Sequence, residues 1–128
     1  MTDPVPTLPQ GQPAGRVIAM PADTNPEGDI FGGWRLSQMD LAAASIAFHR
    51  AAGRCATIAI DGMTFISPVF VGDEVSLFAK VVHTGRTSLK VGVEAWRRSR
   101  DGEQANKVTE GVFTFVAIDE HRKSRPLP

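Results

Sequence analysis

The stretch NPEGDIFGGWRLSQMDLAAASIAFHR, residues 25–50, decides the fold of this chain of 128 residues. It passes from turn-forming residues through a pair of glycines into a helix that we expect over about 33–52. Within Met39–Phe48 only Asp40 is charged. A helix that is apolar on all sides is buried, so a sheet must curl around it or a second subunit must cover it, and we expect both.

The rest of the chain is patterned for β-strands. Runs of β-branched and aromatic residues between turn residues predict strands over about 16–20, 55–66, 74–83, 86–96 and 107–119. Short connections join the last four strands, which favours an antiparallel sheet because parallel pairs need long crossovers. One helix with one such sheet is an α+β domain. We expect this single domain to span residues 16–128, after a flexible, proline-rich arm over 1–15.

The overall composition excludes several classes of protein. Lys plus Arg and Asp plus Glu number 14 each, so no global charge attracts nucleic acid or membrane, although a local basic patch is possible. No signal peptide is visible, and no apolar run approaches the roughly 20 residues of a membrane span. The single cysteine, Cys55, allows no internal disulfide, and no two of the three histidines stand at metal-ligand spacing in the sequence. A reduced, cytoplasmic setting is the default expectation.

Asp40 is the first candidate functional residue. At helical spacing it shares one stripe with Leu36, Ala43, Ala44 and Ala47. A buried carboxylate without partners is costly, so this position favours a chemical role as an acid or base. The structural alternative is a carboxylate satisfied by backbone amides or an arginine, or a helix that is frayed near its start. The helix pattern alone leaves both interpretations open.

Gly32 and Gly33 are the second candidate feature. At a helix start they would expose backbone N–H groups, which suit a developing oxyanion. Gly32 and Asp40 are eight positions apart, about 12 Å along a helix axis, which is too far for one small group to bridge. One site can use both only if Gly32 lies in a loop folded back over the helix, or if the site is shared with another chain.

These segments resemble a known family. MPADTNPEGDIFGGWRLSQMD (20–40), DGMTFISPVFVGDEV (61–75) and GRTSLKV (85–91) are similar to the hotdog-fold acyl-CoA thioesterases, in particular the short bacterial YciA-like group. The spacing of that family's pattern is matched by Asn25, Gly28, Gly32, Gly33 and Asp40, with Phe31 where many relatives have a histidine. The resemblance covers residues 16–128. It implies a curled antiparallel sheet wrapped around one long central helix, in a dimer with active sites between subunits, often assembled into a trimer of dimers.

The resemblance also implies a reaction and roles for residues. The reaction is hydrolysis of an acyl-CoA thioester to a carboxylic acid and coenzyme A, with no cofactor or metal besides the coenzyme A of the substrate. Asp40 would be the general base or the nucleophile, and the amides of Gly32 and Gly33 would stabilise the oxyanion. Asn25 would position the water or the thioester. Thr57 would hydrogen-bond to the carboxylate or water from the partner subunit, although an ordinary β-branched strand residue is the alternative interpretation.

Two segments resemble parts that contact coenzyme A. The turn GRTS would use Arg86 as a phosphate partner, beside Thr87 and Ser88. In the tail, a solvated basic end is the alternative to contacts with the nucleotide phosphates, and the residues concerned are Arg122, Lys123, Ser124 and Arg125. Many relatives carry a glycine-containing turn after the acidic residue, where this chain reads DEHRKSRPLP (119–128).

Two other functions compete with hydrolysis. An acyl-thioester hydratase or dehydratase of this fold generally needs a histidine beside the acid, and the active-site segment has none. A non-catalytic acyl-CoA binder or sensor would normally carry a DNA-binding module, and no basic helix-turn-helix pattern is present. We expect acyl-CoA and further copies of the chain as partners, and neither nucleic acid nor membrane.

Overall fold

A computed structural model of the chain describes residues 7–102 and 104–128. Its elements are β1 (Gly15–Ile18), the short 3-10 helix η1 (Pro21–Asp23), α1 (Gly32–Ala51), β2 (Cys55–Phe65), β3 (Glu74–Thr84), β4 (Ser88–Arg98) and β5 (Ala105–Ala117). The predicted helix and strands are confirmed to within one or two residues at each end. Part of the predicted arm, 1–6, lies outside the described residues, and 7–14 form neither helix nor strand.

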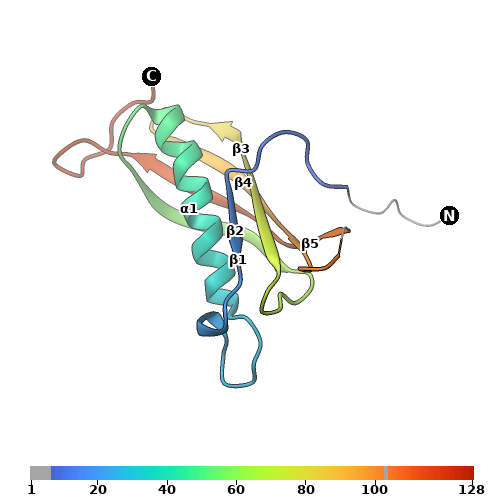
Figure 1. Cartoon of the computed structure of the whole chain (residues 1–128). Coiled ribbons are helices and arrows are strands. Elements are labelled where there is room, and N and C mark those ends of the chain that lie inside the picture. The colour runs from blue at the N-terminus through green and yellow to red at the C-terminus, as the bar shows by residue number, and fades with distance from the viewer. Residues whose placement is uncertain (1–6, 103) are drawn as a thin grey trace.

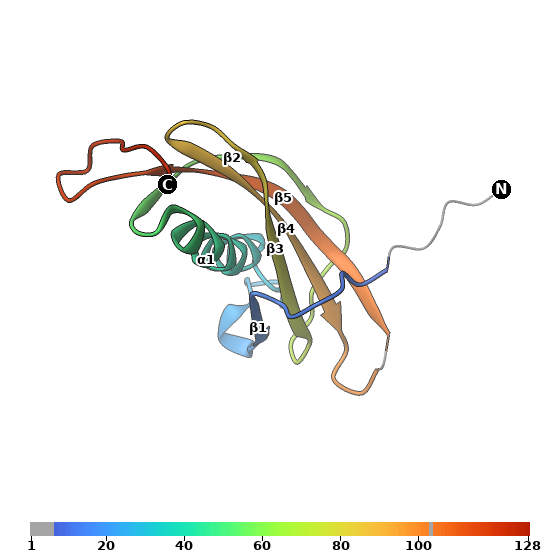
Figure 2. The same cartoon turned by 90° about the horizontal axis from the view of Figure 1, so that it is seen from above.

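The strands form one antiparallel sheet in the order β1-β3-β4-β5-β2. The sheet curls, and α1 lies along its concave face, as Figure 2 shows from above. Along β4 every second residue is buried, namely Leu89, Val91, Val93 and Ala95. A fully buried valine or leucine side chain contributes roughly 1.5–3 kcal/mol, so the inner face of the sheet holds the helix in place. The predicted α+β arrangement is therefore confirmed.

Local signals set the C-terminal end of α1. Ala52 adopts the left-handed conformation with a φ of 53°. The amides of Ala52 and Gly53 donate hydrogen bonds to the carbonyls of His49 and Phe48, which satisfies carbonyl groups of the last turn. Among the described residues, no helix has both the length and the apolar character of a membrane span.

Only one face of α1 packs on the sheet. The residues buried there follow the helical repeat, and they are Arg35, Met39, Ala42, Ala43, Ala47 and Ala51. The predicted stripe is displaced from this one by about one position, because Leu36, Asp40 and Ala44 are only half-buried at its edge. On the outer side, Leu41 is 67% exposed and Phe48 43% exposed. The sheet thus covers one side of α1, and the expectation that a second subunit covers the other side stays a prediction.

Strand β2 forms one edge of the sheet and is open to solvent. Residues 57–62 are all exposed, including Ile58 at 59% and Ile60 at 38%. The pairing of β2 with β5 shifts register between Asp61 and Thr64, where Gly62 has a φ of 59°, so the strand carries a β-bulge at this glycine. A long, apolar edge strand with unpaired backbone groups is a surface suited to pairing with another chain.

The chain folds back on itself after β5. The Asp119 carboxylate accepts hydrogen bonds from the backbone amides of His121 and Lys123. Arg122, between them, has a φ of 62°, a left-handed conformation that glycine adopts at less cost. Figure 1 shows this turn projecting from the body of the protein, near the C-terminal end of α1. A projecting turn with basic side chains is well placed to reach a neighbouring molecule.

Candidate active site

Asp40 and Thr57 meet between α1 and β2. The Thr57 hydroxyl donates a hydrogen bond of 2.9 Å to Oδ1 of Asp40 within the same chain. The predicted contact is present, but its predicted origin in a partner subunit is wrong. The reason is topological, since β2 follows α1 after only a short turn and therefore runs back beside it. Among the described residues no donor bonds to Oδ2 of Asp40, so this half-buried carboxylate is fixed on one side and open on the other.

The start of α1 presents two backbone N–H groups. Within 7–102 and 104–128, neither the Gly32 nor the Gly33 amide donates a hydrogen bond, whereas the amides of Trp34 and Arg35 bond to the carbonyl of Phe31. A Cβ at Gly33 would meet nothing within 4 Å. Two unpartnered donors at the positive end of a helix can bind a developing oxyanion.

The separation of these donors from the carboxylate has a consequence for the site. Gly32 and Asp40 belong to one continuous helix, so about 12 Å lies between them along its axis. A loop folded back over the helix, one of the two arrangements compatible with the sequence, is thereby excluded. The amides and the carboxylate can act on one small group only if a second chain brings its own helix alongside.

Asn25 shapes the loop before α1. Its Oδ1 accepts hydrogen bonds of 3.0 Å from the amides of both Glu27 and Asp29, an arrangement that closes a tight loop. No hydrogen bond joins Asn25 to Asp40 among the described residues. Only the side-chain NH2 group of Asn25 is left to face a substrate, so its predicted role stays a prediction.

Arg35 is a buried charge that the sequence reasoning missed. The residue is only 7% exposed, and one guanidinium nitrogen, Nη1, donates to the carbonyls of Ser67 and Val108 and to the hydroxyl of Thr109. Burial lowers the pKa of the Arg35 guanidinium, which nevertheless keeps its charge at neutral pH. Met39, four residues on, lies on the same buried face, so the helical repeat that drew attention to Asp40 could also have revealed Arg35.

The two predicted coenzyme A segments lie side by side. The Leu127 amide donates to the carbonyl of Arg86 at 2.9 Å, and the Ala117 amide donates to the carbonyl of Thr87 at 2.8 Å. The Arg86 side chain is exposed, while Ser88 is half-buried at the start of β4. The turn before β4 and the C-terminal tail thus form one corner of the protein.

The four tail residues differ in their surroundings. The Arg125 guanidinium donates from Nε to the carbonyl of Ile118 at 3.0 Å and from Nη2 to the carbonyl of Arg54 at 3.4 Å, so it anchors the tail to its own chain. Exposed side chains occupy the projecting turn, namely those of Arg122, Lys123 and Ser124. These three are therefore better placed than Arg125 to meet a phosphate.

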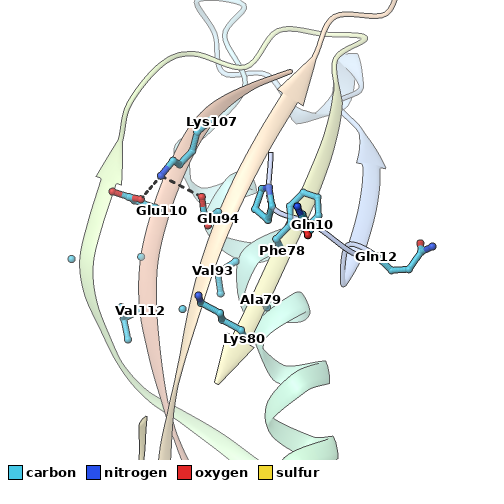
Figure 3. Close-up of a pocket in the computed structure, with 14 residues that line it drawn as sticks. Gln10, Gln12, Phe78, Ala79, Lys80, Val93, Glu94, Lys107, Glu110 and Val112 are labelled. Atoms are coloured by element: carbon cyan, nitrogen blue, oxygen red, sulfur yellow. Dashed lines mark hydrogen bonds and ion pairs between the residues drawn. The ribbon is translucent and has the colours of Figure 1, made fainter. Parts of the chain in front are cut away.

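A separate cavity of about 440 Å³ lies on the face of the sheet away from α1, under residues 9–12 of the arm. Figure 3 shows Lys107 between Glu94 and Glu110 at one end of this cavity, and their ion pairs measure 3.3 and 2.9 Å. None of the predicted catalytic or coenzyme A residues lines the cavity. In the part of the chain that the structure describes, no three His, Cys, Asp or Glu side chains converge to form a metal site.

Comparisons with known proteins show the family of this chain. The model of the thioesterase superfamily matches residues 27–103. A Zymomonas mobilis protein, named an uncharacterized acyl-CoA thioester hydrolase, is 51% identical, over 96% of this chain and 83% of its own. The acyl-CoA thioester hydrolase YciA of Escherichia coli is 47% identical, over 94% of each chain. A crystal structure of an aspartate-to-alanine mutant of a hexameric, broad-specificity acyl-coenzyme A thioesterase superposes with a TM-score of 0.88 at 43% identity, covering 93% of this chain and 88% of that one.

Proposed function

Because this chain belongs to the thioesterase superfamily, we propose that it is an enzyme that hydrolyses acyl-CoA thioesters to a carboxylic acid and coenzyme A. The observation that carries the proposal is the hydrogen bond of Thr57 to Asp40, which leaves the second carboxylate oxygen open. A carboxylate that is oriented in this way, and still reachable by water, has the position of a general base. The names of the relatives at 47–51% identity support the same reaction class.

In the mechanism that we favour, Asp40 takes a proton from a water molecule while the water oxygen attacks the thioester carbonyl carbon. The carbonyl electron pair moves onto oxygen, and the Gly32 and Gly33 amides of the second chain, whose helix lies alongside, donate hydrogen bonds to this oxyanion. When the tetrahedral intermediate collapses, the C–S bond breaks and Asp40 returns its proton to the departing thiolate. Thr57 orients the carboxylate throughout. One such oxyanion donor contributes roughly 10²–10³-fold to kcat in other hydrolases.

The same residues allow a covalent route. Here the Asp40 carboxylate attacks the carbonyl carbon itself, the thiolate of coenzyme A leaves, and water then hydrolyses the mixed anhydride. In either route, the side-chain NH2 group of Asn25 would hold the water or the thioester carbonyl. Neither route requires a metal ion or a cofactor besides the coenzyme A of the substrate.

Coenzyme A would bind at the corner where the turn before β4 meets the tail. Arg86 is exposed there and would pair with a phosphate, beside Thr87 and Ser88. The projecting turn with Arg122, Lys123 and Ser124 would reach the nucleotide phosphates. Because Arg125 already bonds to two carbonyls of its own chain, its role would be to hold this turn in place.

The active site would be completed by a second chain. Two observations support a dimer: the axial separation of about 12 Å between Gly32 and Asp40, and the exposed apolar side chains on β2 and on the outer face of α1. Dimers could assemble further into a trimer of dimers, and the hexameric thioesterase with a TM-score of 0.88 supports this. We place the protein in the cytoplasm, where its free Cys55 would stay reduced.

The decisive experiment is an assay of thiol release with butyryl-CoA, octanoyl-CoA and palmitoyl-CoA. We expect the wild-type chain to release thiol and Asp40→Asn to lose at least about 10²-fold in kcat, because the amide cannot accept a proton. Asp101→Asn makes the same chemical change in an exposed loop and should keep full activity. Circular dichroism and light scattering establish that each variant is folded and assembled like the wild type.

The outcomes test the hydrolase reaction and the role of Asp40 separately. A wild-type chain that releases no thiol from any acyl-CoA would contradict the hydrolase proposal and favour an acyl-CoA binder. An active wild type with an equally active Asp40→Asn variant would leave the reaction intact and remove Asp40 from it.

A further inference from the structure

Arg35 carries a buried positive charge that no acid of the described residues balances. It is 7% exposed, and it forms no ion pair with any described carboxylate. The partners of its Nη1 are two carbonyl oxygens and one hydroxyl, and its buried Nε has no hydrogen-bond partner within 7–102 and 104–128. An unbalanced buried charge lowers stability, and an apolar side chain of similar size would commonly fit such a place better. A buried charge that lowers stability therefore indicates a functional role for Arg35.

The place of this charge is next to the predicted oxyanion donors. The guanidinium carbon of Arg35 lies 5.5 Å from the centroid of the Phe65 ring. The same ring lies 3.4 Å from the position that a Cβ would take at Gly32. The Phe65 ring is therefore close to both the Arg35 guanidinium and Gly32. Together the two distances place the guanidinium within roughly 10 Å of the start of α1.

We propose that Arg35 is a positioning residue of the thioesterase site, which holds Phe65 against Gly32 and adds a full positive charge behind the helix start where the oxyanion forms. The inference rests on the proposed function. The charge acts through the ring and the helix end rather than by touching the substrate. Its effect is largest in the transition state, because only there does the carbonyl oxygen carry a full negative charge.

The distance of the Arg35 charge from the oxyanion sets the size of its effect on the rate. A unit charge at roughly 10 Å, with an effective dielectric constant of about 20, changes the rate of a step that creates an oxyanion by roughly tenfold. Binding of the uncharged thioester should hardly respond. The expected signature is a fall in kcat with an unchanged KM.

The test compares two substitutions that differ in charge. Arg35→Gln keeps hydrogen-bond donors for the carbonyls but removes the charge, and we expect kcat to fall about tenfold with KM changed less than twofold. Arg35→Lys keeps the charge but loses the planar fork, and we expect kcat within threefold of the wild type. Thr109→Val is the matched control, since it removes one acceptor of the guanidinium and leaves the charge in place. It should keep kcat within about twofold.

The outcomes distinguish an electrostatic role of Arg35 in the reaction from a role in folding alone. A wild-type kcat in folded Arg35→Gln would overturn the proposal while the hydrolase function stands. Equal losses in Arg35→Gln and Arg35→Lys, together with lowered melting temperatures, would assign the residue to the fold alone. So would failure of both variants to assemble. An inactive wild type would instead contradict the proposed thioesterase function, and with it the positioning role of Arg35.

Discussion

Replacing Thr57 by valine isolates the contact on which the proposed mechanism depends. The change is nearly isosteric and removes one hydroxyl, whose bond to Oδ1 of Asp40 measures 2.9 Å. A hydrogen bond to a charged group contributes about 1.5–3 kcal/mol when it is buried. Because Thr57 is exposed in the single chain, we take the lower end of this range. If the whole of this free energy serves to orient Asp40 for reaction, kcat of Thr57→Val falls about tenfold.

The stability of this variant should fall by no more than the hydrogen bond contributes. Valine fits a β-strand as well as threonine does, so the free energy of unfolding should drop by at most about 1.5 kcal/mol. Steady-state thiol release gives kcat and KM, and urea denaturation gives the unfolding free energy. A tenfold loss of kcat in a variant that is still folded under the assay conditions would therefore report on the orientation of Asp40.

The same strand offers a matched control. Thr64 is also exposed on β2, and no side-chain hydrogen bond involves it among the described residues, so Thr64→Val should be as active as the wild type. Thr57→Ser retains the hydroxyl and should recover most of the activity. The reasoning is refuted if Thr57→Val retains full kcat while remaining folded, or if Thr64→Val loses as much activity as Thr57→Val.

Two further predictions concern ion pairs away from the site. Asp73 is 3% exposed, and its carboxylate accepts hydrogen bonds from the Arg97 guanidinium at 2.6 and 3.3 Å and from the Phe70 amide at 2.8 Å. Asp73→Ala should therefore lower the free energy of unfolding by about 3 kcal/mol, because it leaves a partly buried guanidinium unpaired. An unchanged midpoint of urea denaturation would contradict this. Hydrogen bonding to Glu110, and secondarily pairing with Glu94, raises the pKa of Lys107 above its ordinary 10.5. The folded state then holds this proton more tightly than the unfolded state, so the stabilisation is complete below pH 10.5 and is lost as the pH rises through the higher folded-state pKa. Melting temperatures of the wild type and Lys107→Met should therefore converge on the alkaline side, and a constant difference up to the highest pH would oppose the assignment.

The sequence alone was sufficient for the elements and the fold class. Turn residues, alternating strands and one apolar helix are local patterns, and each depends on neighbours within a few positions, so α1 and all five strands were predicted to within two residues. The candidate pair Asp40 and Gly32 was equally visible, since a lone charge in an apolar helix and a glycine pair at its start are features of one segment.

What only the tertiary structure decided depends on contacts between distant segments. That Thr57 reaches Asp40 of its own chain follows from the return of β2 beside α1, and no local pattern encodes that packing. Likewise, the tail residue Arg125 is held by carbonyls at Ile118 and Arg54, which a reading of charges along the chain could not distinguish from a free basic end. The spacing of apolar residues predicts the repeat of a helix but not which way the helix is rotated against the sheet. The predicted buried stripe was displaced by one position, so it included Asp40 and omitted Arg35. The sheet fixes that rotation, because packing side chains against it selects one face of α1.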